Sequence, residues 1–153
     1  DRAIKPDDNS LYQTFIGSEF LEEGRRAARW LLKKHQEGQK ANIVELEGTV
    51  GSAPAVDRKK GFSEILTAYP HFKVVYSASG AFTQEGGKAV MGEALSIYGN
   101  DIQVVYAHND DMAIGAIQAI EEAGLKPGKD IIIVSIDGVK GAFEAMIAGK
   151  TTG

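Results

Sequence analysis

The sequence of 153 residues contains no cysteine and only four prolines. Disulfide bonds, a thiolate nucleophile and a cysteine-ligated metal are therefore excluded. No uninterrupted apolar run approaches the roughly 18 residues that a membrane-spanning helix requires. Basic charge is not in excess either, because 17 Lys and Arg stand against 21 Asp and Glu, for a net charge of −4. The chain thus lacks the positive charge typical of proteins that bind nucleic acid or an anionic membrane, and we expect neither partner.

The sequence motifs of common enzymes are missing as well. The glycine-containing stretch at 48–52 has neither the G-x-G-x-x-G spacing of a dinucleotide site nor the lysine of a phosphate-binding loop. No G-x-S-x-G nucleophile elbow and no H-E-x-x-H zinc motif occurs. The polar run 108–111 is a poor metal site, because consecutive residues at a strand end point in different directions. We predict no catalytic residues, no cofactor and no metal ion, and we interpret Asn109 or Asp110 as a helix N-cap.

The sequence does contain five short apolar runs, each followed by a segment with helical periodicity. In the first of these segments Phe20, Ala27 and Leu31 share one face, as in a helix that packs on a sheet. The units repeat at intervals of about 30 residues, the length of one βαβ unit. The five runs are rich in β-branched and aromatic residues and are predicted to be strands: Gln13–Gly17, Asn42–Glu47, Lys73–Ser77, Gln103–Ala107 and Ile131–Ile136.

Uninterrupted apolar runs such as 131–134 predict strands that are covered on both faces. Such strands form parallel sheets with helices on each side. The sequence therefore predicts an α/β fold, a doubly wound, parallel, five-stranded sheet with helices on both faces and the flavodoxin-like strand order 2-1-3-4-5. In this architecture a ligand binds at the carboxyl ends of the strands, so the candidate residues are those that follow each strand.

Four side chains that follow predicted strands are suited to hold a neutral, polyhydroxylated ligand. The guanidinium of Arg58 can donate two parallel hydrogen bonds to adjacent hydroxyls. Asn109 can both donate and accept, and the carboxylate of Asp137 can orient hydroxyls through charge-assisted hydrogen bonds. The ring of Phe82 can cover the apolar face of a sugar ring. Because they come from four different βα units of one sheet, together they favour a binding site.

Each of these side chains also has an ordinary structural explanation. The arginine could form an ion pair with Asp57 or Glu64, and the asparagine could cap a helix. The phenylalanine could belong to the hydrophobic core, and the aspartate could form a turn before the glycine that follows it. Spacing alone leaves the structural and the binding explanations open for each residue.

Four stretches of the sequence resemble a known family. They are Asp1-Arg2, Glu47–Phe62 (EGTVGSAPAVDRKKGF), His108–Ala116 (HNDDMAIGA) and Val134–Gly138 (VSIDG). In their order and spacing these stretches resemble the periplasmic sugar-binding proteins of ABC importers, of the ribose-binding type. The resemblance extends over residues 1–150.

The resemblance implies how the chain is organised. Proteins of this family have two α/β lobes, joined by a hinge of crossing strands, that close on a monosaccharide. This chain is similar to the C-terminal lobe, with residues 1–12 as a hinge segment from the absent N-terminal lobe and 13–150 as the lobe itself. Residues 151–153 stand where the family's chain returns to the first lobe, and we expect this tail to be peripheral or disordered.

The resemblance also implies a function, that of a substrate-binding protein of a sugar ABC transporter. Such a protein is not an enzyme, and it reaches the periplasm after a signal peptide has been removed. Its partners are the monosaccharide, for example galactofuranose, ribose or galactose, and the membrane permease subunits of the importer. The residues that match the family's sugar contacts by position are Asp1, Arg2, Arg58, Phe82, Asn109 and Asp137.

Two alternatives stay open at this point. The effector-binding domain of a lactose-repressor-type transcription regulator has the same lobe architecture, so the chain could instead be such a domain. The basic residues of the first helical segment could form a docking surface for the importer's membrane subunits, although nearby glutamates favour a solvated face with i,i+4 ion pairs. These basic residues are Arg25, Arg26, Arg29, Lys33 and Lys34.

One lobe of such a protein leaves much of the sugar in water, because both lobes enclose it. We therefore expect this chain by itself to bind sugars weakly or not at all. The N-terminal segment 1–9, whose strand partners belong to the other lobe, would present unpaired backbone groups. We expect the isolated chain to form a homodimer through that segment or through its exposed cleft.

Overall fold

The computed structural model describes residues 13–14, 16–35 and 38–153. In this part of the chain five α-helices alternate with four β-strands, and a short 3-10 helix, Gly99–Asp101, follows the third α-helix. The predicted hinge segment 1–12, with the candidate residues Asp1 and Arg2, lies outside the described residues. In chain order the elements are α1 Phe20–Lys34, β1 Ala41–Glu47, α2 Ala53–Leu66, β2 Phe72–Ser79, α3 Gln84–Tyr98, β3 Val104–Ala107, α4 Asp110–Glu122, β4 Ile132–Val134 and α5 Lys140–Ile147.

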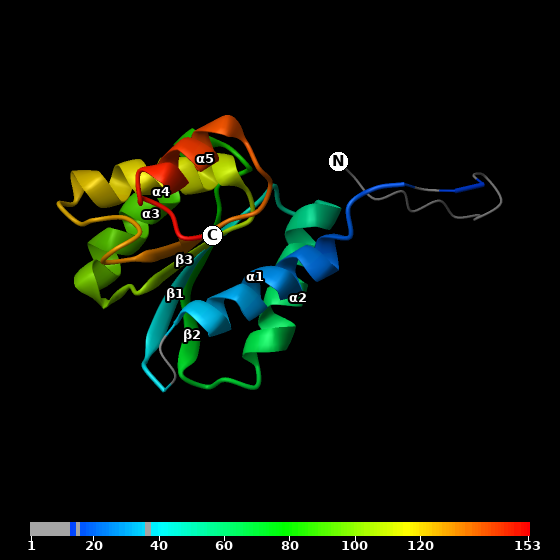
Figure 1. Ribbon diagram of the computed structural model, residues 1–153, viewed down its shortest axis with the longest axis horizontal. Coiled ribbons are helices and arrows are strands. Elements are labelled where there is room, and N and C mark those ends of the chain that lie inside the picture. The colour runs from blue at the N-terminus through cyan, green and yellow to red at the C-terminus, as the bar shows by residue number, and fades with distance from the viewer. Residues whose placement is uncertain (1–12, 15, 36–37) are drawn as a thin grey trace.

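The four described strands form one parallel sheet in the order β2-β1-β3-β4 (Figure 1). The predicted parallel α/β class is confirmed, but the prediction of five strands is wrong, because residues 13, 14, 16 and 17 are not in a strand. The segment 13–17 was predicted to lie between the strands at 42–47 and 73–77. Instead β1 pairs directly with both β2 and β3. The predicted order is therefore wrong as well, because it placed 73–77 next to 103–107, whereas β1 lies between these two strands.

The amino-acid sequence of β1 explains why this strand is an inner one. Every residue from Ala41 to Leu46 is buried, as a strand covered by helices on both faces requires. The segment 13–17 includes polar Gln13 and Thr14, and its Ile16 is 92% exposed. The sequence pattern did not distinguish 13–17 from 41–47. Both are short runs that contain β-branched residues, and both adjoin a segment with helical periodicity.

Helices cover both faces of the sheet, as predicted (Figure 1). α1 and α2 pack on the face that includes Ile43, Val104 and Tyr106. α3 and α4 pack on the face that includes Val44 and Val105. Successive residues of one strand thus belong to different hydrophobic cores, which is the period of two expected for a strand buried on both sides.

α1 and α2 approach each other closely at two glycines. A side chain on Gly24 would overlap the carbonyl oxygen of Arg58, and a side chain on Gly61 would overlap that of Leu21. Only glycine, which has no Cβ, permits backbones to approach this closely. The close contact places Arg58, in the first half of α2, directly against α1.

The C-terminal tail, residues 151–153, packs beside β4 at the outer edge of the sheet. Of the two expected alternatives, a peripheral or a disordered tail, the structure shows the peripheral one. The backbone N–H of Thr152 donates to the carbonyl oxygen of Ile133 (3.1 Å), and the N–H of Ser135 donates to that of Gly153 (2.9 Å). The outer edge of β4 would otherwise leave these backbone groups without a partner strand. The tail therefore continues the backbone hydrogen bonding of the sheet on the outer side of β4.

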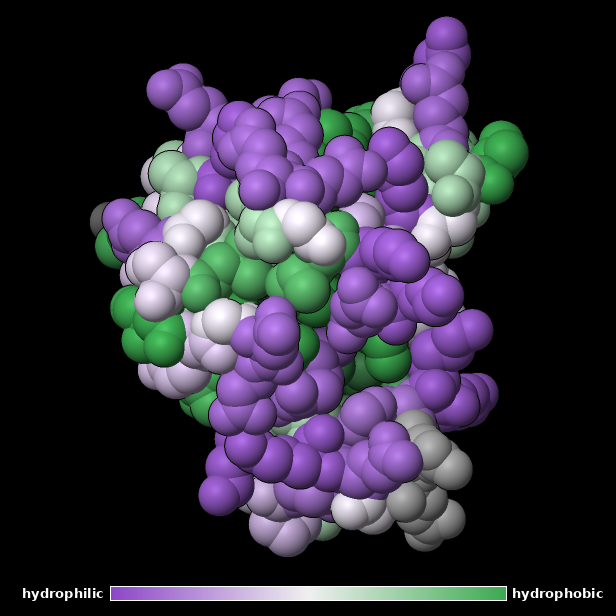
Figure 2. All heavy atoms as spheres, turned by 90° about the vertical axis from the view of Figure 1, so that its left-hand side faces the viewer, coloured by the Kyte–Doolittle hydropathy of each residue, from purple (hydrophilic) through white to green (hydrophobic). Residues whose placement is uncertain are grey.

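The outer surface is mainly hydrophilic around separate hydrophobic patches, as Figure 2 shows for the side that lies on the left in Figure 1. No helix in the described part of the chain is both long and apolar enough to cross a membrane. Phe143 and Ile147 of α5 are 55% and 88% exposed, and no residue of this helix is buried. α5 is thus a surface helix that contributes little to the core.

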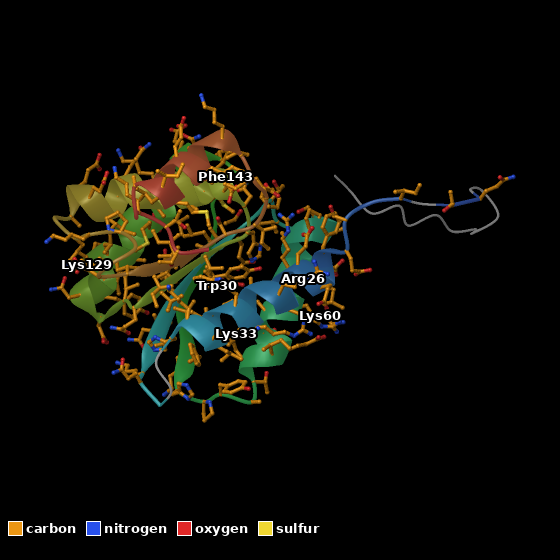
Figure 3. The ribbon with its side chains drawn as sticks, viewed as in Figure 1. Arg26, Trp30, Lys33, Lys60, Lys129 and Phe143 are labelled. Carbon is orange, nitrogen blue, oxygen red and sulfur yellow. The ribbon has the colours of Figure 1, made fainter. Side chains whose placement is uncertain are left out.

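The contact between α1 and α2 leads to a prediction for Gly24. Replacing this residue with alanine should lower the free energy of unfolding by about 1–3 kcal/mol, because the new methyl group forces the two helices apart. The control is Gly92→Ala in α3, where no atom lies near the new methyl group and stability should stay equal or rise by up to about 1 kcal/mol. Urea denaturation followed by the fluorescence of Trp30, the single tryptophan (Figure 3), measures both changes. Equal stability of Gly24→Ala and the unmodified chain would contradict the close contact.

Candidate functional site

The structure places four of the candidate side chains at the carboxyl edge of the sheet. Arg58 lies in α2, after β1, and Phe82 lies in the loop after β2. Asn109 directly precedes α4, after β3, and Asp137 follows β4. Hydrogen bonds join them in two pairs, Arg58 with Asp137 and Asn109 with the backbone of Phe82. Arg58 also donates to the carbonyl oxygen of His108, the residue before Asn109, so the two pairs are linked. The contact of these four residues with a ligand stays a prediction.

Arg58 is held on three sides. Only 8% of its side chain is exposed. Its Nε donates to Glu23 Oε2 (2.8 Å), its Nη1 donates to the carbonyl oxygen of His108 (2.6 Å), and its Nη2 contacts Asp137 Oδ1 at 3.5 Å. The guanidinium carbon lies 5.6 Å from the centre of the Phe20 ring, within the range of a cation–π contact. These contacts turn a flexible side chain into a fixed hydrogen-bond donor.

Asn109 caps α4, as the sequence predicts. Its Oδ1 accepts from the backbone N–H of Met112 (3.1 Å), and Asp110 and Asp111 supply the acidic first turn. Its Nδ2 also donates to the carbonyl oxygen of Phe82 (3.2 Å). The amide therefore connects the start of α4 to the loop after β2. An amide nitrogen carries two N–H groups, and a contact of the second one with a ligand stays a prediction.

The backbone at this edge is strained where the candidate side chains emerge. Ala81 and Phe82 have φ angles of 54° and 65°, and Asp137 has a φ angle of 113°. In the described part of the chain these are the non-glycine residues with positive φ, a conformation that is costly for them and that clusters at functional sites. The Phe82 ring also lies so close to Gly48 that any side chain at position 48 would overlap it. The backbone of Phe82 and Asp137 is thus held in an unfavourable conformation by the surrounding structure.

Asp137 carries its carboxylate in a partly buried position, with 42% of the side chain exposed. Burial raises the pKa of this carboxyl group, the charge of Arg58 opposes the rise, and the neighbouring carboxylate of Asp110 adds to it. Asp137 also lines a small pocket of about 100 Å³, whose walls include Phe143 and Met146 of α5. This edge of the sheet therefore combines hydrogen-bonding groups with negative charge.

A buried polar network, which the sequence analysis missed, lies beneath this edge on the α2 side of the sheet. Glu45 in β1 and His108 after β3 are almost completely buried. Glu45 Oε1 lies 3.2 Å from His108 Nε2, its Oε2 accepts from Ser77 Oγ (2.7 Å), and Lys59 Nζ lies 3.4 Å from the same carboxylate. The His108 Nδ1 accepts from the backbone N–H of Gly48 (3.3 Å). Because Nδ1 accepts this hydrogen bond, the N–H of the ring that faces Glu45 is assigned to Nε2, which donates to the carboxylate.

This network fixes the peptide that follows β3. Because the His108 ring is tied to β1 through Gly48 and Glu45, its carbonyl oxygen stays in position to accept from Arg58. One signal in the sequence pointed to the network, namely a charged residue inside the otherwise apolar run 43–46, since a buried carboxylate needs partners. The partners themselves come from distant segments and could not be read from that run.

Two further acidic residues support the site and were also missed. Asp110 accepts from Ser135 Oγ and from the backbone N–H of Val139 (3.0 Å), so it joins α4 to the loop that carries Asp137. Glu23 on α1 accepts from Arg58. The sequence offered no signal for Glu23, because it lies in a charged segment that is typical of a solvated helix face.

The three arginines of α1 form ion pairs on the surface. Arg29 contacts Glu22 at 2.6 Å, and Arg25 contacts Glu64 of α2 at 2.7 Å. The predicted i,i+4 pairing is present between Arg26 and Glu22 at 3.6 Å, whereas the pairs of Arg25 and Arg29 have other spacings. Glu64 is thereby occupied, and the alternative in which it pairs with Arg58 is wrong.

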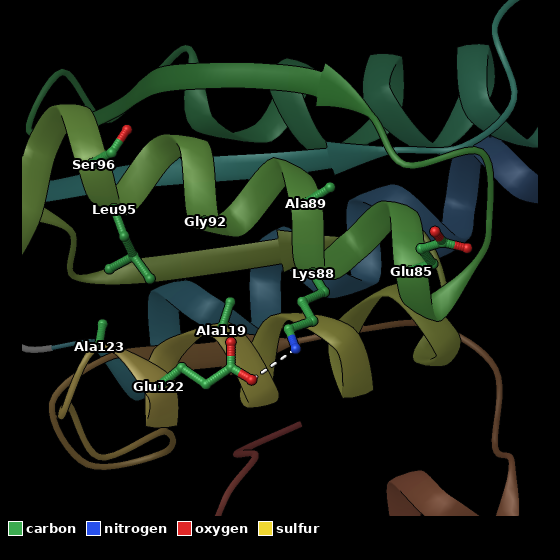
Figure 4. Close-up of a pocket in the computed structure, with 9 residues that line it drawn as sticks. All are labelled: Glu85, Lys88, Ala89, Gly92, Leu95, Ser96, Ala119, Glu122 and Ala123. Atoms are coloured by element: carbon green, nitrogen blue, oxygen red, sulfur yellow. Dashed lines mark hydrogen bonds and ion pairs between the residues drawn. The ribbon is translucent and has the colours of Figure 1, made fainter.

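A larger pocket of about 660 Å³ lies between α3 and α4, and none of the four candidate residues lines it (Figure 4). Small side chains such as Ala89 and Ala119 line it. Lys88 Nζ and Glu122 Oε1 form an ion pair at 2.7 Å across the two helices. Pocket size therefore does not locate the candidate site, which is marked by polar side chains that converge at the strand ends.

A comparison with models of protein families matches the entire chain, residues 1–153, to the periplasmic binding protein domain. The chain belongs to this family. The match agrees with the parallel α/β architecture and confirms the family resemblance found in the sequence.

Three relatives show the extent of the similarity within the periplasmic-binding-protein family. The galactofuranose-binding protein YtfQ of Escherichia coli is 50% identical over 152 residues, which are 98% of this chain and 48% of that protein. The ribose import binding protein RbsB of Bacillus subtilis is 36% identical over 134 residues, 88% of this chain and 41% of that protein. The binding protein of the arabinose ABC transporter of a Shewanella species, solved with α- and β-L-arabinofuranose, has a TM-score of 0.93 at 50% identity and is matched over 99% of this chain and 50% of that chain. The chain therefore spans about half the length of the relatives it matches.

The buried Glu45 should make folding stability depend on pH. Burial by itself would raise the pKa of this carboxyl group, but hydrogen bonds from His108 and Ser77, together with nearby positive charge, outweigh burial and lower the pKa. A carboxyl group with a lowered pKa stabilises the folded state at a pH above its ordinary value of about 4.3, and this contribution is lost as the pH falls through the lowered pKa. Glu45→Gln should therefore be less stable near neutral pH and lose less additional stability on acidification.

Urea denaturation at about pH 7, pH 5 and pH 3 measures this effect, over the range in which carboxyl groups titrate. The control is Glu144→Gln, which removes an exposed carboxylate of α5. We expect the unmodified chain and the control to lose stability in parallel, and Glu45→Gln to lose less. The same loss in all three proteins would show that Glu45 is not held as described.

Proposed function

We propose that the chain forms one lobe of a binding protein for a neutral monosaccharide, and that the whole protein serves an ABC importer. The observation that carries the proposal is the convergence of Arg58, Phe82, Asn109 and Asp137 at the carboxyl edge of a parallel sheet in a chain of this family. The names of two relatives refer to galactofuranose and L-arabinofuranose, which supports a sugar with a five-membered ring.

The four side chains supply complementary contacts for such a sugar. Arg58 offers fixed N–H donors, and the Asp137 carboxylate offers acceptors for hydroxyl groups. Asn109 adds an amide N–H, and the Phe82 ring adds an apolar surface for the C–H groups of the sugar. These groups bind and orient hydroxyls but neither activate a nucleophile nor stabilise a leaving group. We therefore propose binding without chemistry.

The whole protein would have a second lobe. This proposal is supported by the length of the relatives, of which the chain matches about half. Asp1 and Arg2, which lie outside the described residues, are proposed to contact the sugar together with that lobe. Two lobes that close on the ligand can bury the roughly 70–90% of its surface that is typical of small-molecule sites.

The other partners follow from the same proposal. In the periplasm the sugar-loaded protein would dock on the membrane permease subunits of the importer. The names of the relatives refer to import and to an ABC transporter, and this supports a transport receptor over the effector-binding domain of a transcription regulator.

Removal of the Arg58 guanidinium should weaken sugar binding by the whole protein. Arg58→Ala strips charge-assisted hydrogen bonds, which should reduce binding by about 2–3 kcal/mol, or about 30- to 150-fold. Lys60→Ala, an exposed position on the same helix, is the control and should bind like the unmodified protein. Calorimetric titration with L-arabinose and D-galactose measures the dissociation constants. An unchanged constant for Arg58→Ala would refute the assignment of this residue.

The isolated chain should bind sugars barely or not at all. Loss of even two charge-assisted hydrogen bonds to the other lobe would weaken binding by roughly 3–6 kcal/mol, which is about two to four decades. We also expect a tendency to dimerise, as proposed above for the N-terminal segment or the exposed cleft. Titration with pentoses and hexoses, combined with measurement of the mass in solution, tests both expectations. A monomer that binds a sugar tightly would contradict them.

A further inference from the structure

The positive charge of Arg58 is outnumbered by the carboxylates that hold it. Glu23 Oε2 lies 2.8 Å from Nε, and Asp137 Oδ1 lies 3.5 Å from Nη2. Because only 8% of the arginine side chain is exposed, water screens these charges less than it would at the surface. The cluster of one guanidinium and two carboxylates therefore has an excess of negative charge.

The surroundings add to this negative charge. Asp110 and Asp111 lie in the first turn of α4, and both act on Asp137 in the same direction as burial, which raises its pKa. The nearby Lys59 does not compensate, because its Nζ is engaged by Glu47 at 2.7 Å and also by Glu45. The carboxyl edge around Arg58 thus has the character of a site that disfavours anions.

The geometry of Arg58 also limits how it can bind a ligand. Its three partners use three of its five N–H groups, including the one on Nε. Arginine normally binds a carboxylate or phosphate with two parallel N–H groups and a full positive charge. Here Glu23 occupies the Nε side, so the parallel pair that includes the Nε N–H is already engaged by a carboxylate of the protein.

We infer that Glu23 is a specificity-determining residue, which makes the site accept neutral sugars and reject sugar acids and sugar phosphates. This inference rests on the proposed function, since it concerns the same site. Glu23 acts in two ways. It orients the guanidinium through the Nε hydrogen bond, and it cancels the charge that would otherwise attract an anionic ligand.

The test compares Glu23→Gln with the unmodified protein, both as the full-length protein that includes this chain. Glutamine keeps a side-chain oxygen that can accept from Nε but removes the negative charge. Calorimetric titrations use two matched pairs of probes, D-galactose with D-galacturonate and D-ribose with D-ribose 5-phosphate. We expect Glu23→Gln to bind the neutral member within a few-fold of the unmodified protein and to bind the anionic member on the order of tenfold more tightly.

The matched control is Glu22→Gln. Glu22 is the neighbouring residue on α1, and its carboxylate pairs with Arg29 on the surface. This variant makes the same change in net charge away from Arg58, so its preference for neutral sugars should equal that of the unmodified protein. Glu23→Ala, which also removes the acceptor for Nε, should weaken binding of the neutral sugars, and Glu23→Gln should restore it.

Salt provides a second measurement that needs no variant. In the unmodified protein, binding of the anionic probes should strengthen as salt screens the repulsion, while binding of the neutral probes should change little. Two results would overturn the inference about Glu23 in a protein that binds neutral sugars. One is that Glu23→Gln leaves the ratio of neutral to anionic affinity unchanged. The other is that salt weakens the binding of the anionic probes. If the unmodified protein binds no sugar at all, the proposed function itself is overturned.

Discussion

A buried guanidinium needs acceptors on the sides that water cannot reach, and the candidate site is arranged around this requirement at Arg58. Its acceptors come from α1 through Glu23, from the end of β3 through the His108 carbonyl group, and from the loop after β4 through Asp137. Removing one partner of a buried ion pair typically destabilises a protein by about 3–5 kcal/mol, because the other charge is left uncompensated. One side chain thus connects three parts of the fold that are far apart in the sequence.

The same requirement extends into the sheet. The carbonyl group that accepts from Arg58 is held because the His108 ring is bonded to Glu45 and to the backbone of Gly48. A polar group inside a parallel sheet is tolerated only when it is paired, so these residues form a network that is satisfied within the protein. The side chains of the candidate site are thus held in place by contacts within the protein.

Local patterns in the sequence predicted local structure well. The apolar face of α1, with Phe20, Ala27 and Leu31, is buried as expected, and Asn109 caps α4. The strand positions after residue 40 were also predicted to within a few residues. These features depend on neighbours within about one helical turn or one strand, so periodicity and capping residues are sufficient to identify them. The segment 13–17 was misjudged because a short apolar run shows β-propensity but does not reveal whether two helices will cover it.

The sequence by itself determined the fold class, the alternation of strands and helices, and the four residues that follow the strands and meet at one edge. Family motifs added the expectation that this edge binds a sugar. Only the tertiary structure decided that β1 is an inner strand, that residues 151–153 pack on β4, and that Glu23 and His108 hold Arg58. The reason is physical: which acceptor satisfies a buried donor depends on distances between segments that are distant in the chain, and a linear pattern contains no such distances.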